Sequence, residues 1–380
     1  MIKTTLCACL YLLFSFNAAA MDVYYGGFSY LGESSLIEKN FPYSHSLNNV
    51  QNGRSDFDRI LGDRVRSARI TNFELKLDDL ADISDDAMAM TLALESEITS
   101  VEKIGDRYKL LILVSAQILL FDYKNMQVVA TYPIDVQFND SLDHEPTRKD
   151  ILQRYETLYF GDSKVNVLSI FIDRIKQIDP KKKYSNHIKV VNVDIEDKLM
   201  AELGEGISKA QLVQLMGQNF TRFLSINQSV SVLPFTKGHA VGSKLAGRYA
   251  NGEAYMMEIP EPDYAIDIVL VGLKKKEFSK NSSGASYIYA TQADFKFYEP
   301  LSEEIYYQGK LFNAATKKVP TSQSNVLDWP SYSETLIVLF DQLTKTVGNP
   351  DKNWFKKHSS NAKNFEQFYS IKKVIEQCRS

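Results

Sequence analysis

Two stretches of the chain alternate apolar and polar residues over a length that fits three consecutive strands. The first runs from Ala87 to Phe138 and is interrupted by polar residues at 105–107. The second runs from Asp263 to Phe312 and is interrupted at 279–284. Residues two apart in a strand share a face, so each stretch predicts an antiparallel meander. In the second stretch the apolar face comprises Tyr264, Ile266, Ile268, Leu270, Tyr287, Tyr289, Ala293, Phe295, Phe297, Ile305, Tyr307 and Leu311.

Shorter patterns flank both meanders. Aromatic and β-branched residues predict single strands, at 22–31, 70–77, 188–195 and 230–235. Apolar residues three and four apart predict amphipathic helices, at 57–65, 165–178, 207–224 and 332–347. Ser55 and Ser208 precede two of these helices as cap residues. Each half of the chain therefore has the order strand, helix, strand, meander, helix.

This repeated order predicts an α+β fold of two tandem, duplicated domains. Each would be a mostly antiparallel sheet with a three-strand meander packed by helices. Phe121 and Phe297 open the polar turns that end the two middle strands, 176 residues apart (297 − 121). A chain of 380 residues exceeds what one core usually supports. We place the domains at 21–183 and 184–348, followed by a C-terminal tail at 349–380 that is part helical.

Three segments have weaker patterns. Residues 32–54 are rich in Ser, Asn and Gly and predict a long loop. Residues 236–262 contain four glycines, and a short helix is expected around 242–249. Residues 78–86 hold five aspartates. Carboxylate oxygens are the ligands of hard cations, but the spacing fits no EF-hand loop, so a solvated acidic turn is favoured.

The N-terminal residues 1–20 have the pattern of a signal peptide. Lys3 precedes an apolar run from Leu6 to Phe16, and small residues at Ala18–Ala20 suit cleavage near Ala20. The run is shorter than the roughly 20 residues that span a bilayer, and a membrane anchor is the alternative. We expect a periplasmic or secreted protein. Its remaining cysteine, Cys378, would form no internal disulfide.

Charge excludes one class of partner. The net charge is −3, and removing Lys3 with the leader makes it −4 (−3 − 1). A mildly acidic chain has no bulk attraction for nucleic acid. No second apolar run reaches spanning length, so no membrane span is expected in the mature chain. The basic runs 274–276 and 317–318 lie near meander turns, where lysines commonly protect strand edges.

The chain shows no catalytic motif, and we predict neither a cofactor nor a metal site. None of the five histidines pairs with another at helical spacing. Asp143, His144 and Glu145 crowd one loop and favour solvated charge. Asp194 and Glu196 alternate at the end of a predicted strand, so a carboxylate pair for acid–base chemistry is conceivable. An acidic turn before a helix is the favoured interpretation of that pair.

Aromatic residues supply another set of candidates. Tyr24, Tyr25 and Tyr30 lie near the mature N-terminus, and Tyr306 and Tyr307 lie in the last meander strand. Exposed tyrosines suit protein interfaces. Packing on the face of a sheet is the alternative.

The second half resembles the small α/β domain shared by the N-terminal part of TolB and the periplasmic domain of the curli-export channel lipoprotein. The likeness rests on the strand at 188–195 with the helix that follows, on the short strand at 230–235, and on the meander strand that ends near Gly272. The resemblance is fainter in the first half. It implies a non-enzymatic envelope protein that works through protein contacts, often in rings.

Together these observations predict an exported scaffold or assembly protein of a bacterial envelope machine. Its partners would be other envelope proteins or further copies of itself. A periplasmic module that binds a small ligand or glycan through its tyrosines is the second hypothesis. A hydrolase that relies on Asp194 and Glu196 is the third.

Overall fold

The computed structural model describes residues 22–31, 37–51, 54–77, 87–125, 127–163, 165–182, 186–204, 207–235, 244–249, 254–323 and 326–379. The predicted signal peptide and the whole aspartate-rich segment 78–86 lie outside these ranges. Among the described helices, none is long and apolar enough to cross a membrane.

The first sheet is built mainly from the N-terminal half. Its strands follow the order β10-β11-β7-β6-β5-β1-β4. The predicted meander forms its centre, and β1 runs parallel to both β5 and β4. The strands contributed by this half are β1 (Asp22–Leu31), β4 (Glu74–Lys76), β5 (Met88–Ile104), β6 (Arg107–Asp122) and β7 (Gln127–Leu142).

The second sheet has the order β14-β13-β12-β8-β9. The second predicted meander forms one side of it, and β8 runs parallel to both β12 and β9. Its strands are β8 (Ile188–Ile195), β9 (Val232–Leu233), β12 (Tyr264–Asn281), β13 (Gly284–Tyr298) and β14 (Ile305–Pro320).

The two sheets therefore share one topology. The order β4-β1-β5-β6-β7 in the first corresponds to β9-β8-β12-β13-β14 in the second, with the same parallel and antiparallel neighbours. The predicted α+β fold with two tandem units is confirmed. Descent of the two units from one duplicated ancestor stays a prediction.

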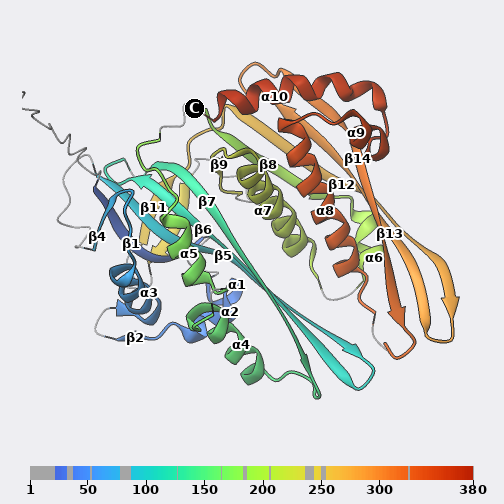
Figure 1. The fold of residues 1–380 in the computed structure, drawn as a ribbon, viewed down its shortest axis with the longest axis horizontal. Coiled ribbons are helices and arrows are strands. Elements are labelled where there is room, and N and C mark those ends of the chain that lie inside the picture. Colours follow the sequence, from blue (N-terminus) through green and yellow to red (C-terminus); the bar gives the residue numbers. More distant parts are fainter. Residues whose placement is uncertain are drawn as a thin grey trace, which may run out of the picture.

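Helices of the first unit cover one face of its sheet (Figure 1). Ser55 caps α3 by accepting a hydrogen bond from the amide of Asp58, as its position predicted. The segment expected to be a loop at 32–54 instead contains two short helices and a strand pair. The elements are α1 (Ile37–Asn40), α2 (Pro42–Leu47), β2 (Val50–Gln51), β3 (Arg54–Ser55), α3 (Asp56–Ser67), α4 (Arg148–Phe160) and α5 (Val167–Ile175).

In the second unit, α7 carries a capping box between Ser208 and Gln211. The C-terminal tail is part of the unit's core, because Phe355, Phe368 and Cys378 are buried with the side chains of α7 and α8. The helices are α6 (Asp197–Leu203), α7 (Lys209–Gln228), α8 (Trp329–Gly348), α9 (Lys352–His358) and α10 (Gln367–Gln377), with a 3-10 turn at Ala362–Glu366.

The helix expected around 242–249 is wrong. Residues Lys244–Tyr249 form strand β10, which pairs with β11 (Ala254–Glu258) in a hairpin. This hairpin joins the sheet of the other unit: β10 lies antiparallel to the end of β1, and Glu258 of β11 lies opposite Gln127 of β7. Tertiary pairing with a distant edge decides the conformation of a short segment whose own pattern is weak.

The two units form successive layers. Figure 1 shows α3, α4 and α5 on one side of the first sheet and α7 between the two sheets. Ile98 and Leu113 of the first meander pack into the core of the second unit. A small separate core lies at the other end of this face, where Leu233 and Ile259 of the second unit cover Ala93, Leu119 and Phe121.

Candidate functional site: the polar junction between the two units

A cluster of polar side chains lies where α7 packs on the first meander. We call it the polar junction and define it by Glu95, Ser96, Ser115, Gln117, Asp135, Gln218 and Arg222. A β-bulge between Leu94 and Ser96 inserts Glu95 as an extra residue in β5. The insertion turns two adjacent side chains, those of Glu95 and Ser96, towards α7, which an unbroken strand does not do. The bulge thus concentrates polar groups on a face that is otherwise apolar.

Glu95 is the most deeply buried acid of the junction, with 8% of its surface exposed. The side-chain amide of Gln117 donates to its carboxylate at 2.8 Å. Burial raises the pKa of Glu95 to about 8, and the amides of Gln117 and Gln218 offset part of that effect. Ser96 donates to Gln218 of α7 at 2.9 Å. A glutamate that keeps its proton near neutral pH can therefore sit between the units without a cation beside it.

An ion pair between Arg222 of α7 and Asp135 of β7 extends the junction to the third strand of the meander. Arg222 Nε lies 2.8 Å from Asp135 Oδ2, and Ser115 donates to the other carboxylate oxygen at 2.5 Å. The guanidinium also lies over the ring of Phe223, 4.0 Å from its centroid. Burial raises the pKa of Asp135, whereas the charge of Arg222 lowers it. The side chains of Asp135 and Arg222 keep 24% and 23% exposure, so water screens this pair only in part.

The two units also touch beyond the junction. Thr131 of β7 donates to the carbonyl of Val232 in β9, which links the edges of the two sheets. At the far end of the meander the amide of Gly105 donates to the carbonyl of Ser322 at 2.6 Å. Glu102 accepts a hydrogen bond from Gln323 in the same connection. The units are thus held at both ends of the first meander as well as in its middle.

A cleft of about 290 Å³ opens beside the junction. The first unit contributes Tyr132 of β7 and Arg174 of α5, and the second contributes Ser225 and Ile226 of α7. Asp179 also lines it. Its volume lies at the lower end of the range for small-molecule sites. A small polar molecule that pairs with Arg174 is the chemistry this cleft can accommodate.

The predicted acidic pair lies elsewhere, at the end of β8. Lys209 lies 3.0 Å from Asp194 and 2.6 Å from Asp197, whereas Lys198 lies 2.5 Å from Glu196. Each of the two candidate carboxylates is thus partnered by a different lysine. Exposed ion pairs of this kind are common on protein surfaces and contribute little to stability.

The candidate tyrosines divide into two groups. Tyr30 and Tyr307 are core residues with 4% and 2% exposure, so they leave no aromatic surface. Tyr24, Tyr25 and Tyr306 are half-buried. The ring of Tyr306 packs edge-on against Tyr264 and Phe297. Sheet-face packing, the alternative interpretation, therefore describes Tyr30 and Tyr307.

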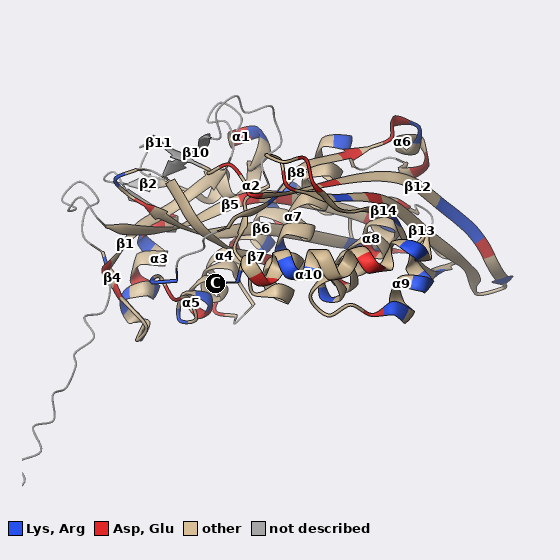
Figure 2. Ribbon diagram, turned by 90° about the horizontal axis from the view of Figure 1, so that it is seen from above, with Lys and Arg blue, Asp and Glu red and all other residues tan. Residues whose placement is uncertain are grey.

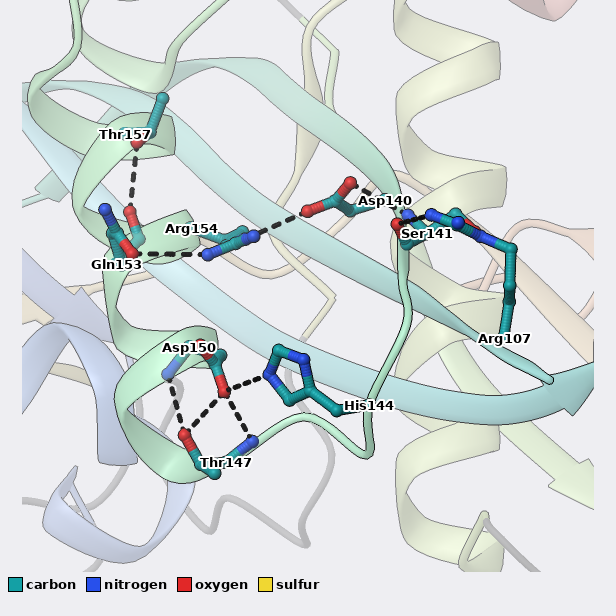
Figure 3. Close-up of polar contacts among 9 residues, drawn as sticks. All are labelled: Arg107, Asp140, Ser141, His144, Thr147, Asp150, Gln153, Arg154 and Thr157. Atoms are coloured by element: carbon teal, nitrogen blue, oxygen red, sulfur yellow. Dashed lines mark hydrogen bonds and ion pairs between the residues drawn. The ribbon is translucent and has the colours of Figure 1, made fainter.

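His144 takes part in a helix cap (Figure 3). Its ring nitrogens lie 2.8 Å from Asp143 Oδ1 and 3.2 Å from Asp150 Oδ2. Asp150 forms a capping box with Thr147 at the start of α4. These hydrogen bonds raise the pKa of His144. Within the described ranges, no group of three or more His, Cys, Asp or Glu side chains could hold a metal ion.

The residues of the polar junction were not predicted from the sequence. The available signal was Gln117, a lone amide inside the apolar strand 110–121. A buried amide needs a hydrogen-bond partner, so its presence indicates a second polar group on a neighbouring element. Only the register of the meander identifies that group as Glu95.

Comparisons with known proteins assign this chain to no family. No family model matches the chain, and no curated protein matches it. Among solved structures, it is similar to a DUF330-family protein from Xanthomonas campestris, with 10% identity, a TM-score of 0.23, and coverage of 43% of this chain and 81% of that one. A minor lipoprotein from Acinetobacter baumannii has 7% identity, a TM-score of 0.21, and coverage of 46% and 98%.

A third similar structure is the rare lipoprotein B from Shewanella oneidensis. It has 15% identity and a TM-score of 0.20, and the match covers 41% of this chain and 91% of that one. At these scores neither fold nor function carries over to this chain. The resemblance to TolB inferred from the strand pattern stays a prediction.

Proposed function

We propose that this chain is an exported protein of the cell envelope that acts as a scaffold, through contacts with other proteins and without catalysis. The observation that supports this most is the hairpin β10–β11. It leaves the second unit and becomes part of the first unit's sheet. Two units that share strands present their surfaces in a fixed relation, which is what an assembly protein requires.

The polar junction supports the same proposal. Buried hydrogen-bonded networks are specific in geometry, because every partner must be in place to offset desolvation. The hydrogen bonds that Gln117 donates to Glu95 and Ser96 donates to Gln218 favour one arrangement of α7 on the first meander. The ion pair between Arg222 and Asp135 favours the same arrangement. From the sequence, the leader, the lack of a catalytic motif and the paired meanders led to the same class of function.

Site-specific crosslinking in the producing cell tests the proposal. A photoreactive residue is placed at the exposed Tyr369 on α10 of the second unit, and at the exposed Lys149 on α4 of the first unit. The same envelope protein is expected to crosslink from both units. A chain that is monomeric by light scattering and crosslinks to no envelope protein would contradict the scaffold role. The double variant Asp194→Ala, Glu196→Ala is expected to keep the wild-type phenotype; its loss would favour a hydrolase.

Binding of a small ligand is the second candidate, because the cleft beside the junction brings Arg174 and Tyr132 together. Thermal shift against a panel of metabolites and glycans tests it. A ligand that uses this cleft is expected to raise the melting temperature of the wild type and to lose that effect in Arg174→Ala. An Arg59→Ala variant serves as the control, since Arg59 is an exposed arginine on α3. A ligand that stabilises all three chains equally binds elsewhere.

A further inference from the structure

The second meander continues well beyond the helices that cover its base (Figure 1). Pairing between β8 and β12 ends at Leu270. From there β12, β13 and β14 continue together to the turn at 282–283. We call this part the distal ribbon and define it as residues 271–281, 284–291 and 313–320. All eight residues at 274–281 are exposed.

Lysines dominate the exposed strand of the distal ribbon, seen in Figure 2 as the blue stretch of β12. Lys275 lies 2.7 Å from Asp328, and Lys317 pairs with Glu334. Across the described part of the chain, the other lysines of the ribbon have no ion pair. They are Lys274, Lys276, Lys280 and Lys318. Glu277 is the ribbon's one acidic residue.

The strand register places three of these lysines together. Lys274 lies opposite Ala290, Lys276 opposite Ile288, and Lys318 opposite Ser286. These β13 partners are even-numbered, whereas the odd-numbered Tyr289 is buried against the helices. Successive side chains of a strand point to opposite faces. The three lysines therefore share the face that turns away from α8.

An aromatic side chain accompanies the lysines. The register of β12 shifts between Glu277 and Ser279, so Phe278 is the extra residue of a bulge. Its surface is 70% exposed. Phe278 stands between Lys276 and Lys280 near the end of a projecting ribbon. The fold of this chain therefore leaves the ring of Phe278 free to contact another surface.

We propose that the distal ribbon docks on an anionic lipid surface, with the lysines at the headgroups and Phe278 inserted between them. Basic residues near an anionic bilayer are attracted to it, and aromatic residues partition to the interface. Addition of a partner strand is disfavoured, because lysines along an edge oppose such pairing. Nucleic acid is disfavoured by the chain's net charge of −3. This inference is independent of the scaffold role.

Vesicle co-sedimentation tests the proposal. The full chain is mixed with vesicles of phosphatidylcholine and phosphatidylglycerol, or of phosphatidylcholine alone. Every variant keeps the same N-terminus, so any contribution of residues 1–20 cancels. The wild type is expected to bind the anionic vesicles and to be released by salt, because the screening length falls to about 8 Å at physiological ionic strength.

The decisive variant is Lys274→Gln, Lys276→Gln, Lys318→Gln, which removes the three lysines that share this face. Each lysine near an anionic surface contributes about fivefold to binding, so the triple variant is expected to bind roughly 100-fold more weakly. The control Lys39→Gln, Lys149→Gln, Lys373→Gln removes the same charge from exposed helical positions. It is expected to bind like the wild type. Phe278→Ser is expected to weaken binding about tenfold. Circular dichroism checks that all variants are folded.

Three results would overturn the proposal. One is wild-type binding that is equal on the two vesicle types. Another is equal loss in the ribbon variant and its control, which would mean that overall charge and not the ribbon attracts the surface. The last is ribbon-dependent binding to polyglutamate with none to vesicles, which would assign the ribbon to an acidic protein.

Discussion

Both meanders carry a β-bulge at the same place in their first strand, yet the two bulges face different surroundings. The bulge in β5 lies at Glu95 and the bulge in β12 lies at Val271, 176 residues apart (271 − 95). The same interval separates Phe121 from Phe297 in the sequence. Glu95 is buried under α7, whereas Val271 is half-buried at the start of the distal ribbon. One backbone feature thus serves a buried contact in one unit and a bend towards solvent in the other.

The difference follows from what covers each sheet. The first meander has α4 on one face of its far half and the second unit's core on the other. In the second unit the connection from Thr321 leads to α8, and its described residues, 321–323 and 326–328, contain no counterpart of α4. Residues 274–281 in the far half of β12 consequently stay exposed, and most of them are polar or charged. The two units thus share their strand order. The segments that follow the meanders differ, and they determine which sheet surface stays uncovered.

The largest effect is expected at the residues that cover the first meander. Tyr155 of α4 is fully buried, stacks on Tyr43 at 4.4 Å, and its hydroxyl lies 3.0 Å from Thr99. Tyr155→Ala is expected to destabilise the first unit by about 3–5 kcal/mol, as for other large core aromatics. Phe278→Ala in the far half of the second meander is expected to change stability by less than about 0.5 kcal/mol. Urea denaturation measures both. Equal losses would mean that the two far halves are packed alike.

The next effect depends on pH and concerns Glu95. Its pKa is 4.5 in the unfolded chain and about 8 in the folded protein, which therefore holds this proton more tightly. Stability from this group is present below pH 4.5 and is lost as the pH rises through 8. Glu95→Gln removes the ionisation, so the variant is expected to exceed the wild type in stability above pH 8, by at most about 5 kcal/mol.

Chemical denaturation across this pH range measures the effect of Glu95→Gln. The exposed Glu366 provides the control, and Glu366→Gln is expected to follow the wild-type curve. A Glu95→Gln variant whose stability changes with pH in parallel with the wild type would show that Glu95 titrates normally. The second meander has a valine, Val271, at its equivalent bulge position, so that position has no counterpart of the Glu95 ionisation.

A smaller loss is expected from Arg222→Ala. The change leaves Asp135 partly buried without its cation. Breaking a fully buried pair costs about 3–5 kcal/mol, and the remaining exposure of both side chains reduces the expectation to about 2–3 kcal/mol. Arg59→Ala breaks an exposed pair on α3 and is expected to change stability by less than about 0.5 kcal/mol. Equal losses in the two variants would place Asp135 in effectively aqueous surroundings.

The parts of the fold that the sequence predicted are those with long, regular patterns. Both meanders, strand β8 and helix α7 with its Ser208 cap agree with their predicted positions. Each is specified by its own periodicity, which needs no information from distant residues. Most of the buried face of the second meander was likewise predicted from its alternating apolar residues, but Ile305 is 45% exposed and Tyr287 is half-buried.

The parts that were missed depend on distant partners. Hairpin β10–β11 pairs with β1 and β7, which lie far away in the sequence. The polar junction depends on a β-bulge at Glu95, and the residue types of β5 do not predict that bulge. Helix α4 was missed although Thr147 and Asp150 form a capping box at its start, because its apolar residues are interspersed with charges. The capping residues of α4 were thus visible in the sequence, but the charged residues within the helix obscured its apolar pattern.

The smallest expected effect is at the start of α4, the helix that distinguishes the two units. The carboxylates of Asp143 and Asp150 accept hydrogen bonds from the ring of His144 and raise its pKa, so the protonated form of His144 favours the folded state. That stability is present below the ordinary pKa of 6.5 and is lost as the pH rises through the raised value. The melting temperature of the first unit is therefore expected to fall slightly between about pH 5 and 8 in the wild type. His144→Gln is expected to flatten that fall, and Asp143→Asn to reduce it, whereas His358→Gln in the second unit should leave it unchanged. A wild-type slope that survives in His144→Gln would assign the pH dependence to other groups and would leave α4 capped by Thr147 and Asp150 alone.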